Sequence, residues 1–120
     1  MLFSDITILD KNFEVCEHMF VGIKDKTIAY VGAAEPKEDF GSVYNGRGKL
    51  LMPAFYNAHT HSAMTLLRGY AENMNLQDWL NTKIFPFEAK MVGSDICTGV
   101  KLAMAESIRS GIVSSTDMYY

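Results

Sequence analysis

Short apolar stretches separated by turn residues make up the first third of the chain. Residues 2–9 alternate loosely between apolar and polar side chains, a pattern that predicts a β-strand. Residues 18–23 and 27–31 are rich in β-branched and aromatic side chains and flank the polar residues 24–26, which is typical of a β-hairpin. Residues 34–49 contain one proline and three glycines and therefore indicate a loop or an irregular sheet edge.

From residue 50 onward, longer apolar segments replace the short alternating ones. Residues 50–58 are almost continuously apolar, which favours a strand buried on both faces, as in a parallel sheet. Residues 64–83 have the spacing of a helix, and residues 95–110 predict another helix that Ser94 caps and a glycine ends. Residues 112–120 begin with β-branched and end with aromatic side chains, which predicts a further strand.

The order strand, helices, strand predicts a βαβ unit, the repeating element of parallel α/β folds. A closed (β/α)8 barrel of the TIM type needs about 250 residues, whereas only about 70 residues follow Leu50. We therefore expect residues 50–120 to be the first βαβ portion of a barrel that is incomplete in this chain. Residues 1–49 are expected to precede it as a separate portion made of β-strands. A small open α/β domain is the alternative.

The composition is that of a globular protein, with 48% hydrophobic and 21% charged residues. A net charge of −3 and the scattered lysines and arginines argue against a nucleic-acid or anionic-membrane partner. The apolar stretches are too short to span a bilayer, and Asp5 and Asp10 interrupt any run that resembles a signal peptide. Cys16 and Cys97 form no CxxC motif and are expected to be reduced, as in a cytoplasmic protein.

Two histidines follow the predicted strand at a spacing that suits a metal ion. His59 and His61 are two residues apart, so on a strand they project to the same side with Cα atoms about 6.5 Å apart. Two imidazoles at this separation can converge on one ion, with each nitrogen about 2.0–2.1 Å from it. The carboxyl end of a barrel strand is also where such folds carry their chemistry. The alternative is a polar loop with both rings bonded to the backbone. The third histidine, His18, is expected at the surface.

The sequence around these histidines resembles the metal-binding strand of the amidohydrolase superfamily. Residues 53–61 read Pro-Ala-Phe-Tyr-Asn-Ala-His-Thr-His, similar to the superfamily pattern except that alanine replaces the usual glycine. The segments that narrow the resemblance to the methylthioadenosine/S-adenosylhomocysteine deaminase branch are residues 62–71, 76–80, 84–90 and 117–120. The resemblance covers essentially the whole chain. It implies that residues 1–49 are the first part of the small β-sandwich that flanks the barrel in these enzymes.

The resemblance also implies roles for individual side chains. His59 and His61 would hold one zinc ion, with iron or manganese as alternatives, while the other ligands and the proton-transferring catalytic residues would lie outside this chain. Glu88 would accept hydrogen bonds from substrate hydroxyls, although its position alone favours a solvated helix carboxylate. Trp79 would line the substrate pocket, or it is a core residue. Arg68 is expected to make a structural ion pair.

These implications define a preferred function and its alternatives. The preferred one is a zinc-dependent hydrolytic deaminase of an adenosine-like small molecule, of the S-adenosylhomocysteine or methylthioadenosine type. A second hypothesis keeps the site but changes the substrate to guanine or a chlorinated triazine. A third treats the chain as an inactive fragment or an interaction module. The expected protein partner is either a second copy, in a homo-oligomer, or the missing remainder of the barrel.

Overall fold

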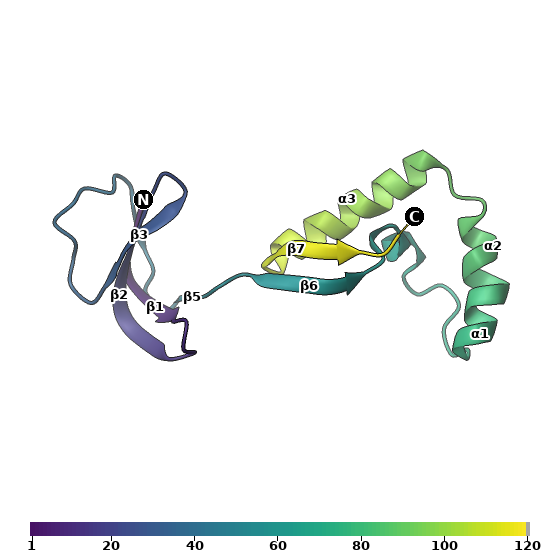
Figure 1. Ribbon diagram of the computed structural model, residues 1–120, viewed down its shortest axis with the longest axis horizontal. Coiled ribbons are helices and arrows are strands. Elements are labelled where there is room, and N and C mark those ends of the chain that lie inside the picture. The colour runs from purple at the N-terminus through teal and green to yellow at the C-terminus, as the bar shows by residue number, and fades with distance from the viewer. Residues whose placement is uncertain (120) are drawn as a thin grey trace. The chain divides into compact units, whose positions relative to one another are not determined.

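The computed structural model describes residues 1–119 (Figure 1). The chain divides after Pro53 into two compact units, of which the first is Met1–Pro53 and the second begins at Ala54. The first unit is a sheet with the strand order β3-β2-β1-β4, in which β5 also pairs with β1. Its strands are β1 (Leu2–Leu9), β2 (Val15–Lys24), β3 (Thr27–Gly32), β4 (Val43–Asn45) and β5 (Leu50–Leu51). β1, β2 and β3 are antiparallel neighbours, whereas β4 and β5 run parallel to β1. The predicted first strand and hairpin are confirmed.

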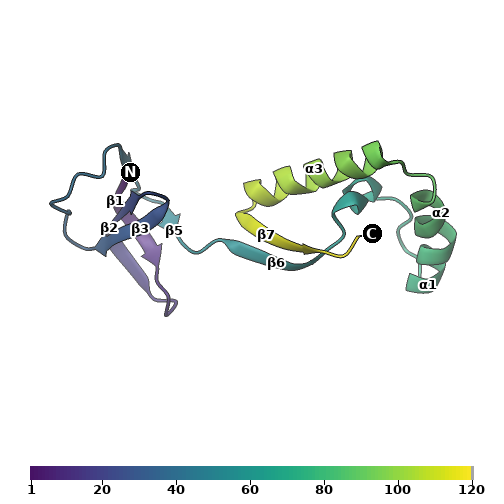
Figure 2. The same ribbon diagram turned by 45° about the horizontal axis from the view of Figure 1, so that its top comes forward.

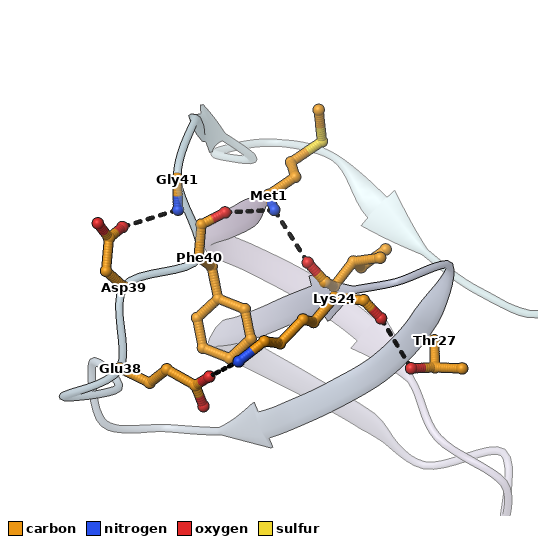
Figure 3. A network of polar contacts seen from close by, with 8 residues as sticks. Met1, Lys24, Thr27, Glu38, Asp39, Phe40 and Gly41 are labelled. Atoms are coloured by element: carbon orange, nitrogen blue, oxygen red, sulfur yellow. Dashed lines mark hydrogen bonds and ion pairs between the residues drawn. The ribbon is translucent and has the colours of Figure 1, made fainter.

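The hairpin between β2 and β3 turns at Asp25 and Lys26. Both residues have positive φ angles, 49° and 66°, as the tightest hairpin turns require. Figure 3 shows how the chain terminus is tied to the same end of the sheet. The amino group of Met1 donates to the carbonyl oxygen of Ile23 at 2.9 Å and also to that of Phe40. This end of the sheet is therefore held by polar contacts.

A small apolar core holds the first unit together. Ile6, Ile8 and Val21 are buried, and Leu51 packs against them from β5. Because Leu51 belongs to this core, the unit extends to Pro53 and not to residue 49 as the sequence indicated.

The prediction of one buried strand over residues 50–58 is wrong in two respects. β5 ends at Leu51 and β6 (Phe55–Thr60) begins only after Pro53, which has no N–H to donate to a strand ladder. β6 is also largely exposed: Phe55 keeps 54% and Tyr56 77% of its surface accessible. Within residues 1–119, β6 pairs with one strand, so its apolar residues have few neighbours there.

The second unit is a βαβ arrangement, as predicted. After β6 the helical elements are a 3₁₀ helix η1 (Ser62–Leu67), α1 (Leu76–Trp79), a π-helical turn η2 (Leu80–Ile84), α2 (Phe85–Glu88) and α3 (Gly93–Arg109). The chain then returns in β7 (Ile112–Asp117), which pairs with β6 in parallel. α3 lies along this strand pair in both Figure 1 and Figure 2. No helix among the described residues is long and apolar enough to cross a membrane.

α3 begins and ends at identifiable signals. Its predicted cap, Ser94, is wrong, because the helix starts at Gly93 and Ser94 lies inside the first turn. The carboxylate of Asp95 instead accepts a hydrogen bond from the backbone N–H of Val92 at 2.9 Å. At the other end Gly111 has a φ of +75° and stops the helix, as predicted.

The region predicted as one helix over residues 64–83 is broken. η1 ends at Leu67, and positive φ angles at Gly69, Ala71 and Asn73 turn the chain before α1 begins. Asn75 caps α1 by accepting a hydrogen bond from the N–H of Asp78 at 3.0 Å.

The helix that starts with α1 then continues through η2 into α2. In η2 the N–H of Phe85 donates to the carbonyl oxygen of Leu80, five residues back, which is the π-helical pattern. Pro86 follows as the second residue of α2 and has no N–H to donate to the preceding turn, where the hydrogen bonding is already irregular. The π-helical turn thus lies between Trp79 and Glu88.

Candidate functional site

The two predicted metal ligands converge at the end of β6. His59 is the fifth residue of the strand, and His61 follows its last residue. Their Nε2 atoms lie 3.1 Å apart, and the ring planes meet at 81°. Two nitrogens bound to one tetrahedral ion at 2.0–2.1 Å would be separated by about 3.3 Å. The predicted convergence of the rings is confirmed, while metal binding itself stays a prediction.

The ring of His61 is oriented by the backbone after β7. Its Nδ1 atom lies 2.9 Å from the carbonyl oxygen of Met118. A carbonyl can only accept, so Nδ1 carries a proton, and in the neutral ring Nε2 then presents a lone pair. The N–H of Met118 donates in turn to the carbonyl oxygen of Thr60 at 2.9 Å, which holds the carbonyl in place. This is the arrangement in which a histidine binds a metal through Nε2.

The short distance between the two Nε2 atoms also indicates where a proton lies without a metal. When the ring of His61 is neutral with its proton on Nδ1, a hydrogen bond between the rings needs the proton on Nε2 of His59. A divalent cation can replace that proton if His59 changes tautomer. The donor set therefore fits one cation that prefers imidazole ligands, such as zinc or iron.

Asp117 supports the turn that carries the second histidine. It ends β7 opposite Thr60, and its carboxylate accepts a hydrogen bond from the N–H of Ser62 at 3.2 Å. This contact ties the residue after His61 to the neighbouring strand. In residues 1–119, no group of three or more histidine, cysteine, aspartate or glutamate side chains is arranged to hold a metal.

Glu88 is the last residue of α2 and has a partner that the sequence did not reveal. The hydroxyl of Tyr119 donates to Oε1 of Glu88 at 2.9 Å, in a half-buried contact. The same hydroxyl lies 3.9 Å from the sulfur of Met91. Tyr119 falls in the segment that resembles the end of the second barrel strand of the deaminase branch, but no spacing pattern marks it as a partner of a helix residue. Glu88 is thus a hydrogen-bonded carboxylate.

Trp79 borders a different hollow. It is half-buried at the end of α1 and lines a cavity of about 490 Å³ with the turn formed by residues 69–74. Of the described residues that line this cavity, none is His59, His61 or Glu88. The structure therefore brings the two histidines together and leaves the predicted substrate role of Trp79 as a prediction.

Arg68 forms the ion pair that was expected of it. Its guanidinium donates from both terminal nitrogens to the carboxylate of Glu106 on α3, at 3.0 and 2.6 Å. The hydrogen bond and the positive charge of Arg68 lower the pKa of Glu106, and the carboxylate raises the pKa of Arg68. The pair joins the end of η1 to α3.

Several deaminases are similar in sequence to most of this chain. A 5-methylthioadenosine/S-adenosylhomocysteine deaminase of Halothermothrix orenii is 41% identical over 115 residues, which are 92% of this chain and 27% of the relative. A 5′-deoxyadenosine deaminase of Methanospirillum hungatei is 53% identical over 78 residues, which are 65% of this chain and 17% of the relative. The chain spans about a quarter of the length of such relatives.

Solved structures give the same picture of the fold. An adenosine deaminase from Xanthomonas campestris with bound zinc matches 99% of this chain and 28% of its own length, with a TM-score of 0.78 and 28% identity. An atrazine chlorohydrolase from Arthrobacter aurescens, complexed with zinc, matches 97% of this chain and 28% of its own, with a TM-score of 0.84. At 20% identity the second match shows the fold alone. The expected α/β class is confirmed at the level of the TIM-barrel amidohydrolases.

The family profile covers more than half of the sequence, including both histidines and the returning strand. It matches residues 50–120, the part that builds the βαβ unit, and its description is that of the amidohydrolase family. The resemblance first seen around His59 and His61 therefore extends through the whole second unit. This chain belongs to the amidohydrolase family.

Proposed function

We propose that this chain is the N-terminal part of a zinc-dependent deaminase. The enzyme would remove the amino group of an adenosine-like nucleoside by hydrolysis. The observation that carries the proposal is the pair of Nε2 atoms 3.1 Å apart, in which the ring of His61 is oriented by a backbone carbonyl 2.9 Å from its Nδ1 atom. The names of the relatives support the substrate class, methylthioadenosine or S-adenosylhomocysteine. In this proposal the βαβ unit is the start of a barrel whose other strands lie outside this chain.

His59 and His61 would hold the metal, for which zinc is the first choice and iron or manganese are alternatives. When bound, such an ion supplies a water molecule whose pKa is lowered towards neutrality. The work of the remaining side chains is to hold the substrate. Glu88 accepts hydrogen bonds from the ribose hydroxyls, and Trp79 walls the pocket on the side of α1. The residues that move protons belong to the rest of the protein.

The same proposal covers the binding partners of the protein and its location in the cell. Its partner is a small purine nucleoside, with no nucleic acid or membrane, because the charges of the chain form no basic cluster. We place the protein in the cytoplasm, since Cys16 and Cys97 are both free thiols. A homo-oligomer or the remainder of the barrel covers the exposed face of β6 and β7.

The test uses the full-length protein with His59→Ala and His61→Ala, assayed for ammonia release and for zinc content. Each variant is expected to lose at least about 100-fold in turnover together with most of its zinc, because a metal ligand is removed. His18→Ala is the matched control, since this histidine is exposed in the first unit. Unchanged kinetics in both site variants would contradict the metal assignment.

The choice of substrate is tested with the unchanged protein. A panel of adenosine, methylthioadenosine, S-adenosylhomocysteine, guanine and a chlorinated triazine separates the proposed deaminase from its alternatives. Turnover confined to guanine or the triazine would keep the site but reject the nucleoside. A zinc-loaded protein that turns over none of the panel would reject the proposal.

A further inference from the structure

Two consecutive residues after β7 contact both parts of the candidate site. The backbone of Met118 accepts from Nδ1 of His61 and donates to Thr60. The hydroxyl of Tyr119 donates to the carboxylate of Glu88, which comes from α2. The planar peptide bond between residues 118 and 119 restricts how these two contacts move relative to each other. The segment therefore links the proposed metal ligand to the proposed substrate carboxylate.

We propose that Tyr119 is a positioning residue, which orients the carboxylate of Glu88 for the hydroxyls of a ribose-bearing substrate. This inference rests on the proposed function. The carboxylate has about four sites for hydrogen-bond donors, of which the hydroxyl of Tyr119 takes one on Oε1. The sites on Oε2 suit two neighbouring hydroxyl groups, such as the vicinal diol of a ribose.

The surroundings of Glu88 explain why it needs such a partner. It is the last residue of the four-residue α2, and the chain leaves the helix directly after it. A glutamate at a helix end can populate several rotamers, so a bond to a fixed donor selects one of them. Tyr119 is suited to this task because it is half-buried, and its hydroxyl is also 3.9 Å from the sulfur of Met91.

α2 has a second contact, which Phe87 makes. The ring of Phe87 packs against that of Tyr70, with centroids 5.3 Å apart. This contact fixes the helix but does not reach the carboxylate of Glu88. The orientation of the carboxylate therefore depends on Tyr119 in a way that the packing of the helix does not replace.

The decisive variant is Tyr119→Phe in the full-length, zinc-loaded enzyme, because it removes one hydroxyl and keeps the ring. We expect KM for an adenosine-type substrate to rise about tenfold, as for a weakened hydrogen bond to a charged group. The Kd of the inosine-type product, which keeps the ribose, should rise by a similar factor. kcat and zinc content should stay within about twofold, since His61 is bound through the backbone of Met118.

Two comparisons separate positioning from a general structural effect. In a Glu88→Gln background, Tyr119→Phe should change KM little, because the two side chains act through one contact. A 2′,3′-dideoxy substrate should likewise show little difference between the wild type and Tyr119→Phe. Tyr30→Phe is the matched control: it also removes a hydroxyl that donates a hydrogen bond, here to Ala34 at 2.6 Å in the first unit. Its KM should be unchanged.

The outcomes that overturn the inference are distinct from those that overturn the proposed function. An unchanged KM in Tyr119→Phe, or an equal loss with the dideoxy substrate, would reject the role of Tyr119 while leaving the deaminase intact. A loss of zinc or a fall in kcat alone would also reject it. A wild-type enzyme that turns over no adenosine-like nucleoside would instead reject the proposed function.

Discussion

Among single residues, Asp5 and His18 occupy an unusual backbone geometry. Both have positive φ angles, 52° and 56°, and they lie where the register of β1 and β2 shifts. Such angles are costly for residues other than glycine. Asp5 accepts from His18 Nδ1 at 2.7 Å and from Arg47 Nε at 2.8 Å. These two ion pairs offset the strain at the irregular part of the sheet.

We expect this cluster to make the stability of the chain depend on pH. The hydrogen bond that His18 donates to Asp5 raises the pKa of His18, so its contribution is complete below the unfolded pKa of about 6.5 and is lost as pH rises through the higher folded value. His18 and Arg47 lower the pKa of Asp5, whose contribution is present above its unfolded pKa and is lost as pH falls through the lower folded value. The cluster is thus most stabilising in mildly acidic solution.

The measurement is the urea midpoint of His18→Gln relative to the wild type at about pH 5.5 and about pH 8.5. The destabilisation should be clearly larger at the lower pH, where the wild-type ring is charged. Lys24→Gln is the control, because Lys24 also forms an exposed ion pair and Glu38 raises its pKa further above this range. A difference that is equal at both pH values would count against the cluster.

The sequence predicted single residues well where a role follows from spacing. His59 and His61 converge because positions i and i+2 of an extended chain face the same side. The pairing of Tyr119 with Glu88 could not be predicted, since it joins residues 31 positions apart through the fold. The same holds for Asp5 and His18, whose pairing depends on the irregular register between β1 and β2.

Between elements, the contact of α3 with η1 depends on one glycine. A Cβ atom on Gly99 would lie 2.4 Å from the carbonyl oxygen of Ala63, a backbone atom that has little freedom to move away. Ala63 is fully buried in this contact and lies two residues after His61. The close approach therefore helps to fix the segment that carries the second histidine.

Gly99→Ala is expected to destabilise the chain by about 1–3 kcal/mol through this overpacking, despite the better helix propensity of alanine. Urea unfolding followed by circular dichroism measures the loss. Gly93→Ala is the matched control, because it lies in the first turn of α3 with no atom within 4 Å of the new Cβ. If the two variants were equally stable, α3 and η1 could move apart at no cost in free energy, and the close contact at Gly99 would not matter for stability.

Elements were predictable where one signal dominated. The hairpin, the returning strand and the end of α3 at Gly111 follow from local turn chemistry and periodicity. The apolar run over residues 50–58 was misleading because its first two residues form β5, which pairs with β1 in one unit, whereas β6 belongs to the other unit. The breaks after η1 arise from positive φ angles at Ala71 and Asn73, which have no strong signature in sequence.

Over the whole molecule, both units keep large apolar side chains exposed. In the βαβ unit these include Tyr56 at 77%, Ile108 at 72% and Val113 at 67%. Surfaces of this kind are normally covered by other parts of a protein. The length of the sequence alone indicated that these apolar surfaces lack packing partners within the chain, since a closed barrel needs about 250 residues. How the barrel closes is not encoded in local patterns.

We expect the isolated 120-residue chain to show no deaminase activity and to bind zinc at less than one ion per chain. Two imidazoles leave a zinc ion short of the three or four protein ligands that it takes in stable sites. Zinc content after dialysis and ammonia release from adenosine measure both points, with the full-length protein as the control. A stoichiometric, active preparation of this chain alone would show that its own residues complete the site.

The π-helical turn η2 has a consequence for comparing this protein with its relatives. Each residue of a regular helix rotates the next side chain by about 100°. Loss of one residue between Leu80 and Ile84 would therefore swing Glu88 around the helix axis, away from the hydroxyl that it meets here. A homologue could keep every histidine, glutamate and tyrosine and still misplace its carboxylate. A one-residue gap in this helix is thus a sign of a displaced carboxylate even where the side chains around it are unchanged.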